Sequence, residues 1–314
     1  MTTNNDDFPF PHVLRIEPAS QCNLSCSHCP TGTVDMERTV MSETVFEKVL
    51  AEIELHKNQI KVIVLYHGGE PLLNKHFYSM VARIKEINPD FFLKTVSNGM
   101  ALTLKHAKHV IDSGIDVIEF SLDGDSAQES QHIRVQSNTD KIVSNIKALI
   151  DLKAQLKMSK PDIYVSTTQF LRDKTQEDIP SEAPVPTWLR DTFKDEVAGY
   201  KSTYALQWPH MGDTGEYDFL RTEGDDGDEC DHVVSTLTVR ADGSIVPCCY
   251  DLTNKLEMGN ILDQKLMEIW NGKKYRILRA AIESKKHISI CKKCAVVKPP
   301  VYLIPKWSQK IVAI

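Results

Sequence analysis

The chain has 314 residues, of which 41% are hydrophobic and 25% charged, and its formal net charge is -6 at pH 7. It contains no Lys/Arg-rich block, which disfavours proteins that bind nucleic acid or membrane surfaces by electrostatics. No apolar run reaches the ~20 residues needed to cross a bilayer, and the polar N-terminus MTTNNDDF lacks a signal-peptide core. We therefore expect a soluble, cytoplasmic globular protein with one large domain and a smaller one.

From Val13 to Leu206, short apolar runs alternate with longer segments of helical period. This pattern predicts repeated strand-helix units on a parallel sheet. Ser42 is a suitable N-cap for one helix, whose apolar residues recur every four positions. Residues 171–200 contain three prolines and many charges, and we expect them to form a connection. The predicted strands are Val13–Glu17, Val62–Tyr66, Phe91–Val96, Val117–Leu122, Ile163–Thr168 and Tyr204–Gln207.

Three of the eight cysteines, Cys22, Cys26 and Cys29, form a C-x3-C-x2-C set directly after the first predicted strand. Clustered cysteines in a reduced compartment indicate metal binding or catalysis before disulfides. The loops that follow parallel strands open onto one face, where catalytic groups gather. Three thiolates are one short of the four that saturate a 4Fe-4S cluster, so one iron would stay open to another ligand. A zinc site that borrows His28 is the alternative.

Polar or glycine residues also follow the second, third and fourth predicted strands. Two glycines allow a ligand to approach the backbone closely, and a carboxylate can accept bonds from an ammonium group. Each of these short motifs is an ordinary turn sequence when taken alone. Together they are expected to lie on the same face as the cysteines, and the candidates for cofactor binding are Gly68, Gly69, Glu70, Ser97, Asn98, Ser121 and Asp123.

A second group of cysteines lies near the C-terminus. Cys230 and Cys248 flank a predicted hairpin that turns at Asp242-Gly243, so the hairpin brings them together. Cys291 and Cys294 form a C-x2-C pair about forty residues later. The four are expected to be ligands of one metal group, with Cys249 as a buried bystander that could replace Cys248. A zinc ribbon has similar spacings and is the alternative here.

The stretch IEPASQCNLSCSHCP resembles the signature of the radical S-adenosylmethionine (SAM) superfamily, and HGGEPLL at 67–73 resembles its GGE motif. His28 stands where that family usually has an aromatic residue. The resemblance implies a partial (β/α)6 TIM-like barrel of α/β class. It also implies a SAM-binding 4Fe-4S cluster on the first three cysteines, reductive cleavage of SAM to a 5′-deoxyadenosyl radical, and hydrogen abstraction from a substrate. The GGE residues would receive the SAM amino group, and the later strand ends would contact its ribose.

The C-terminal half resembles the SPASM/twitch extension of the same superfamily, whose C-x9-15-G-x4-C opening is present. The resemblance implies one auxiliary, fully ligated 4Fe-4S cluster, which would accept an electron from the substrate. PCCYDLTNKLEMGNI and CKKC are most similar to radical SAM aminocyclitol alcohol dehydrogenases. We accordingly expect oxidation of a sugar or aminocyclitol alcohol, a flavodoxin-like electron donor, a barrel at 1–200 and an auxiliary domain at 201–314.

The general base of such a reaction is the least determined residue. Among the candidates near the end of the last predicted strand, only His210 carries an imidazole, whose ordinary pKa suits a general base. Two other functions stay open: a radical SAM peptide maturase that crosslinks or epimerises residues, and a zinc-binding interaction module. The module leaves the GGEP motif and the strand-helix units unexplained.

Overall fold

The computed structural model describes residues 7–173, 175 and 179–307. At its centre is a nine-stranded sheet in the order β10-β9-β8-β1-β2-β3-β4-β5-β6. Strands β1 to β6 are parallel to their neighbours, and β8 pairs in parallel with β1 on the other side. Their carboxyl ends therefore meet at one edge of the sheet. The strands are β1 (Val13–Ile16), β2 (Val62–Val64), β3 (Phe92–Ser97), β4 (Val117–Ser121), β5 (Asp162–Gln169), β6 (Gly199–Tyr204), β8 (Thr236–Val239), β9 (Ser244–Val246) and β10 (Gly259–Asn260).

Side chains alternate between the two faces of each strand, which gives β1 an apolar and a polar face. Leu14 and Ile16 are fully buried in the main hydrophobic core. Arg15 and Glu17 take the opposite face, and both are also buried. The face with Arg15 and Glu17, called the inner face below, therefore carries buried charged side chains that need partners.

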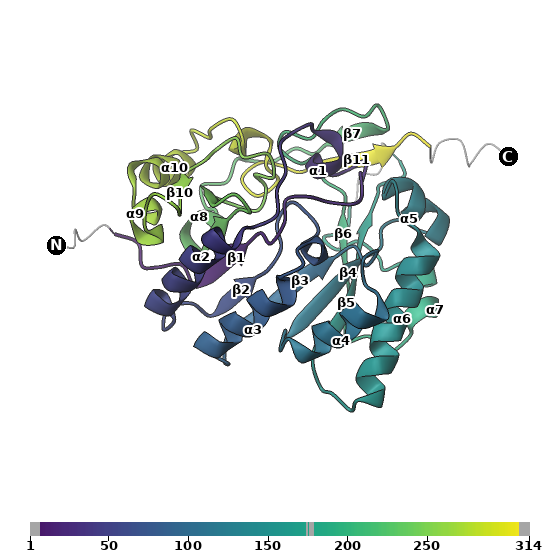
Figure 1. The fold of residues 1–314 in the computed structure, drawn as a ribbon. Helices are drawn as coiled ribbons and strands as arrows, with labels where there is room; N and C mark the ends of the chain where they lie inside the picture. Colours follow the sequence, from purple (N-terminus) through teal and green to yellow (C-terminus); the bar gives the residue numbers. More distant parts are fainter. Residues whose placement is uncertain (1–6, 174, 176–178, 308–314) are drawn as a thin grey trace.

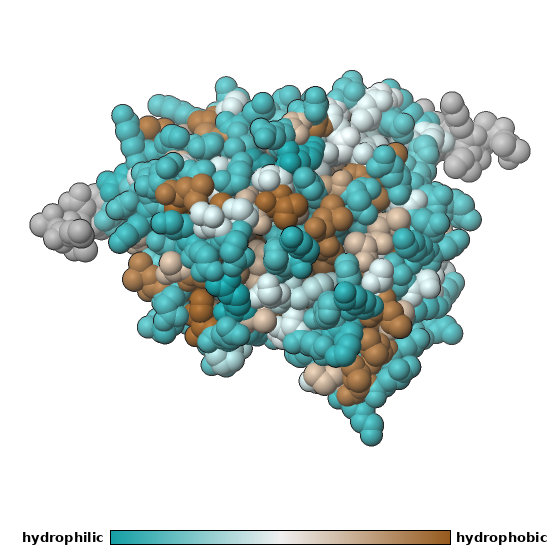
Figure 2. All heavy atoms as spheres, in the orientation of Figure 1, coloured by the Kyte–Doolittle hydropathy of each residue, from teal (hydrophilic) through white to brown (hydrophobic). Residues whose placement is uncertain are grey.

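Helices cover the apolar face of the sheet, and Figure 1 shows α2, α3, α4 and α6 one after another along it. The predicted cap is confirmed, because the Ser42 side chain accepts the backbone N–H of Val45. In the space-filling view of this side, hydrophilic residues cover most of the surface and hydrophobic ones form separate patches (Figure 2). The helices are α1 (Pro30–Thr33), α2 (Glu43–His56), α3 (Phe77–Ile87), α4 (Leu104–Asp112), α5 (Ala127–Ile133), α6 (Thr139–Gln155), α7 (Thr187–Phe193), α8 (His232–Ser235), α9 (Leu266–Trp270) and α10 (Lys273–Glu283), with short 3-10 helices η1 (Pro71–Leu73) and η2 (Cys291–Lys293).

The C-terminal part continues the sheet instead of forming a separate core. The predicted hairpin is present as β8 and β9, which pair antiparallel on either side of Gly243, a residue with a φ of +85°. A second small sheet pairs β7 (Tyr217–Arg221) with β11 (Val301–Pro305). The division into domains at residue 200 stays a prediction, and β6 runs across that residue.

One strand prediction is wrong. The sixth strand was expected at Tyr204–Gln207, but β6 occupies Gly199–Tyr204. Its sequence GYKSTY has no apolar run, and six residue pairs with β5 hold it in the sheet instead. In the part of the chain that the structure describes, no helix is long and apolar enough to cross a membrane.

Candidate active site

The loop after β1 places Cys22, Cys26 and Cys29 around one pocket. All three are free thiols, and they line a space of about 810 Å³ that is partly open to solvent. The loop is fixed by backbone bonds, in which Ser25 N–H donates to Val135 O at 3.0 Å and Ser27 N–H donates to Ile133 O at 3.0 Å. The predicted grouping of these cysteines at the carboxyl edge of the sheet is therefore present.

Burial makes the thiols of Cys22 and Cys26 hard to ionise by themselves. It raises the pKa of Cys22, and it raises the pKa of Cys26 to about 12, while the nearby Arg134 guanidinium opposes both shifts. Thiolates bind metals, and a bound metal displaces the thiol proton. The buried Arg134 guanidinium beside the three thiols would offset the negative charge of thiolates that bind a metal group.

The Gly68–Glu70 loop lies against the cysteine loop. A side chain at Gly69 would collide with the backbone carbonyl oxygens of Ala19 and Gln21, so this position needs glycine. The carboxylate of Glu17 accepts the N–H of Gly68 at 2.8 Å. The two loops thus form one rigid wall of the pocket.

The Glu70 carboxylate is 2% exposed and already has internal donors. It accepts Leu72 N–H at 3.1 Å, Ser97 Oγ–H at 2.8 Å and Asn98 N–H at 2.7 Å. Burial still raises its pKa overall. A carboxylate has about four acceptor positions, so one remains for a cationic donor that would stabilise the ionised form.

The predicted cofactor-binding residues separate into two groups. Gly68, Gly69, Glu70, Ser97, Asn98 and Ser121 all line the pocket of the three cysteines. Asp123 does not line it; its carboxylate binds Arg134 Nη1 at 2.7 Å and lies 3.5 Å from His28 Nε2. The geometry gives Asp123 the role of holding Arg134, whose side chain does line the pocket.

The prediction missed Arg134, which is 8% exposed and stands in the loop after α5. Its Nε has no hydrogen-bond partner within the described residues. A lone arginine belongs to no motif, and only the packing of this loop against the cysteines reveals it. His28 is half-buried, and its desolvation lowers its pKa although the Asp123 carboxylate opposes the shift.

The histidine proposed as a base is not at the pocket. His210 does not line the pocket of the three cysteines, whereas Trp208, two residues earlier, does. His67 does line it, and its Nε2 lies 3.2 Å from the backbone oxygen of Asp251. Burial lowers the pKa of His67 to about 4.

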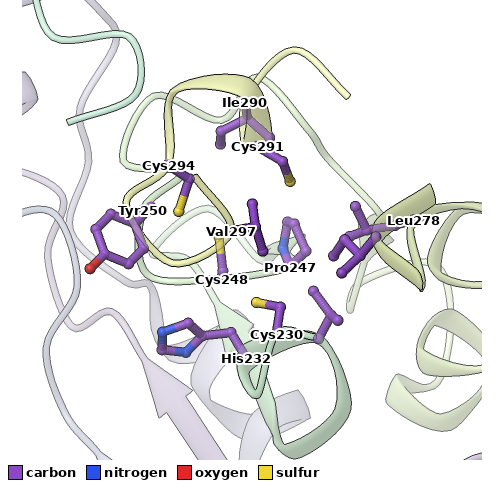
Figure 3. A pocket seen from close by; sticks show the side chains of 12 residues that line it. Cys230, His232, Pro247, Cys248, Tyr250, Leu278, Ile290, Cys291, Cys294 and Val297 are labelled. Carbon is purple, nitrogen blue, oxygen red and sulfur yellow. The ribbon is translucent and has the colours of Figure 1, made fainter. Parts of the chain in front are cut away.

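The four C-terminal cysteines surround a second cavity of about 380 Å³ (Figure 3). Cys230 precedes α8, Cys248 follows β9, Cys291 begins η2 and Cys294 follows it. Figure 3 shows their sulfur atoms turned toward a common space that Pro247 and Val297 also border. Cys249 does not line this cavity; its Sγ lies 3.7 Å from His232 Nε2.

These donor sets suit iron-sulfur clusters better than single ions. Among the described residues, no three His, Cys, Asp or Glu side chains converge closely enough to hold one metal ion. A zinc ion needs its ligands within about 2.3 Å of one point. A cubane cluster places irons and sulfides between its cysteines, so the cysteine sulfur atoms can lie farther apart than around a single ion. The two cavities thus fit one cluster with three cysteine ligands and one with four.

Aromatic side chains connect the two cavities. Trp208 lines the first and Tyr250 lines the second, and their ring centroids are 4.9 Å apart. Leu252 adds an apolar contact on the side of the first cavity. A molecule in the first cavity would therefore lie close to the second group of cysteines.

Comparison with known families and proteins agrees with this geometry. A family model described as "Radical SAM superfamily" matches residues 16–157, and the SPASM model, described as "Iron-sulfur cluster-binding domain", matches residues 230–295. A GTP 3′,8-cyclase of Campylobacter curvus is 25% identical over 205 residues, which is 62% of this chain and 61% of that relative. The chain thus spans less than two thirds of that cyclase. A tungsten-containing aldehyde ferredoxin oxidoreductase cofactor-modifying protein of Pyrococcus furiosus is 24% identical over 306 residues, covering 85% of this chain and 82% of the relative.

Solved structures share the fold. BtrN in complex with AdoMet and 2-DOIA superposes with a TM-score of 0.60 at 18% identity, covering 91% of this chain and 94% of BtrN. Streptococcus suis SuiB bound to its precursor peptide SuiA gives a TM-score of 0.64 at 12% identity, covering 91% of this chain and 71% of SuiB. At these identities the likeness concerns the fold and not the substrate.

Proposed function

Because this chain belongs to the radical SAM superfamily and carries a C-terminal SPASM-type domain, we propose that it oxidises an alcohol group of a small sugar or aminocyclitol. Its cofactors are SAM, a 4Fe-4S cluster that binds SAM, and auxiliary iron-sulfur cluster binding in the SPASM domain. One observation carries the proposal: the three N-terminal cysteines and the Gly68–Glu70 loop line the same pocket.

In this proposal each part of SAM has a partner in the pocket. Cys22, Cys26 and Cys29 would hold the cluster, and three thiolates would leave one of its four irons open to SAM. The free acceptor position of Glu70 receives the amino group. Arg134, with its unpartnered Nε, is placed to balance the carboxylate and the thiolates. Ser97, Asn98 and Ser121 are polar groups on the same wall and are available to the ribose.

The bound cluster and SAM together supply a 5′-deoxyadenosyl radical that abstracts a hydrogen atom. The chain's own task is to position the substrate and to keep water away from it. Tyr66, Trp208 and Leu252 provide the apolar part of the pocket wall for this purpose.

Oxidation of an alcohol to a ketone removes one hydrogen atom, one proton and one electron. When bound, SAM and its cluster would take the hydrogen atom, an auxiliary cluster held by Cys230, Cys248, Cys291 and Cys294 would take the electron, and the hydroxyl proton would pass to water at the open side of the pocket. The contact between Trp208 and Tyr250 supports this assignment because it brings the first pocket next to the second. A small flavodoxin-like protein is the proposed source of the electron that starts the reaction.

The test compares wild-type protein with a Cys22→Ala/Cys26→Ala/Cys29→Ala variant after anaerobic reconstitution. Iron, sulfide and zinc are counted, and 5′-deoxyadenosine is measured after addition of SAM and dithionite. We expect about eight irons in the wild type and about four in the variant, with deoxyadenosine formed only by the wild type. Zinc in place of iron, without SAM cleavage, would overturn the proposal.

A further inference from the structure

The side chain of Arg15 is buried against the sheet, and two of its guanidinium nitrogens lack a hydrogen-bond partner among the residues that the structure describes. It is 8% exposed on the inner face of β1. Within the described part of the chain, its Nε and Nη1 have no hydrogen-bond partner, and no carboxylate forms an ion pair with it. Unpartnered donors on a buried cation cost free energy, so the two free nitrogens of Arg15 indicate a further group that it binds.

A second unused donor stands beside it. Thr238 on β8 pairs with Arg15 in the parallel register, so both side chains point to the same face. Thr238 is fully buried and its Oγ1 also has no partner among the described residues. Two neighbouring strands thus carry unpartnered donors on the same face of the sheet.

The inner face has more positive than negative charge near these donors. Glu119 on β4 is shared by two ammonium groups, at 2.7 Å from Lys94 Nζ and 2.6 Å from Lys201 Nζ. Glu17 is used by Arg240, whose Nε is 3.5 Å away. One carboxylate, Glu119, is therefore shared by two cations, Lys94 and Lys201, and forms no ion pair with Arg15 within the described residues.

This positive region borders the pocket of the three cysteines. The Arg15 guanidinium carbon is 5.7 Å from the centroid of the Tyr66 ring, and Lys94 Nζ is 5.9 Å from the same centroid. Tyr66 lines the pocket. The thiol of Cys249 lies between two partners, a hydrogen bond from Arg15 and His232 Nε2 at 3.7 Å, so Cys249 takes up part of the Arg15 guanidinium.

We propose that Arg15, with Thr238 and Lys94, forms a subsite for an anionic oxoacid group of the substrate, a carboxylate or a phosphate. The arginine fork matches the oxygens of either group. This inference rests on the proposed function and narrows its substrate: an acidic or phosphorylated sugar fits the pocket, and a cationic aminocyclitol does not.

The test measures binding to reconstituted, SAM-loaded protein by isothermal titration calorimetry, without turnover. The probes are inorganic phosphate, glucose 6-phosphate and glucuronate, with glucose and glucosamine as neutral and cationic counterparts. The variants are Arg15→Gln, Arg15→Lys and the control Arg83→Gln, which removes an arginine on the outer helix α3. Circular dichroism verifies that each variant is folded.

We expect an anionic probe to bind the wild type at least tenfold more tightly than glucose or glucosamine. Arg15→Gln should weaken that binding by about 10- to 100-fold, because hydrogen bonds to charged groups are lost. Arg15→Lys should weaken it less, and Arg83→Gln should not change it. Preference for glucose 6-phosphate or glucuronate identifies which oxoacid the subsite takes.

The subsite is overturned if none of the three anions binds the wild type below about 10 mM, a limit of roughly 3 kcal/mol of binding free energy. It is equally overturned if glucosamine binds best, or if folded Arg15→Gln binds the anions as well as the wild type. Deoxyadenosine formation by the wild type is measured separately. If it persists while the anions fail to bind, the proposed function stands and only the subsite is wrong.

Discussion

Glu17 Oε1 accepts the backbone N–H of Gly68 at 2.8 Å, which ties the end of β1 to the loop that forms the pocket wall. The other oxygen of the same carboxylate accepts the N–H of Ala241 at 3.1 Å, in the turn that follows β8. Arg240 Nε lies 3.5 Å from that oxygen. One fully buried side chain therefore joins the N-terminal loop, the glycine loop and the C-terminal hairpin.

Replacing Glu17 with glutamine should weaken this junction. The amide has one oxygen, so its NH2 group must face a backbone N–H or Arg240. We expect the free energy of unfolding to fall by about 1–3 kcal/mol, because a buried donor loses its acceptor. Glu54→Gln is the control, since Glu54 forms an exposed pair with Lys57 and should change stability by less than about 0.5 kcal/mol. Urea unfolding measures both, and equal effects of the two changes would show that Glu17 has no joining role.

Gly69→Ala should disturb the pocket more than the fold. The new methyl group would collide with the carbonyl oxygens of Ala19 and Gln21, which forces the glycine loop away from the cysteine loop. We expect SAM affinity, measured by equilibrium dialysis, to fall at least tenfold. Gly227→Ala is the matched control, because its methyl group would meet Val297 at 3.5 Å, an ordinary contact. Undiminished SAM affinity in Gly69→Ala would contradict the close approach of the two loops.

The sequence predicts those parts of the site that depend on local order. The three N-terminal cysteines and the glycine loop each follow a strand directly, and parallel strands bring their carboxyl ends together without further information. The hairpin at Gly243 is equally local. For this reason the grouping of Cys22, Cys26 and Cys29 with Glu70 could be predicted from the sequence alone.

Other parts depend on contacts between distant segments. Strand β6 has no apolar run, and its pairing with β5 places it several residues before the predicted position. Arg134 reaches the pocket only because the loop after α5 packs on the cysteine loop. The sequence shows Arg15 only as one residue of an ordinary strand, because its lack of a carboxylate partner depends on how distant segments pack. Asp123 and His210 each follow the end of a predicted strand, but Asp123 binds Arg134 and His210 does not line the pocket.

The two adjacent cysteines Cys248 and Cys249 should differ in their effect on iron content. Cys248 lines the second cavity with three other cysteines, whereas Cys249 contacts His232. After anaerobic reconstitution we expect Cys248→Ser to lose the auxiliary cluster, so that about eight irons fall to about four. Cys249→Ser should keep its iron and serves as the matched control. Iron loss in Cys249→Ser with retention in Cys248→Ser would reverse the assignment.

His67 should make stability depend on pH. Burial holds its pKa at about 4 in the folded chain, against an ordinary value of 6.5. Between these values the unfolded chain binds a proton on this side chain and the folded chain does not. The stability linked to His67 is therefore fully present above pH 6.5 and decreases as the pH falls toward 4.

Removing this group should reduce the pH dependence. Between pH 7 and pH 5, the loss linked to His67 is about 2 kcal/mol, from about 1.5 pH units at about 1.4 kcal/mol each. His67→Asn should therefore lose about 2 kcal/mol less stability than the wild type over this range, although it is less stable at pH 7 because it gives up the contact with the Asp251 oxygen. Urea unfolding under anaerobic conditions at pH 7, 6 and 5 measures the difference, with His12→Asn, an exposed position, as the control. If His67→Asn and the wild type lose the same stability from pH 7 to pH 5, the His67 imidazole is not held neutral by burial, and the pocket around it is more open to water than its packing indicates.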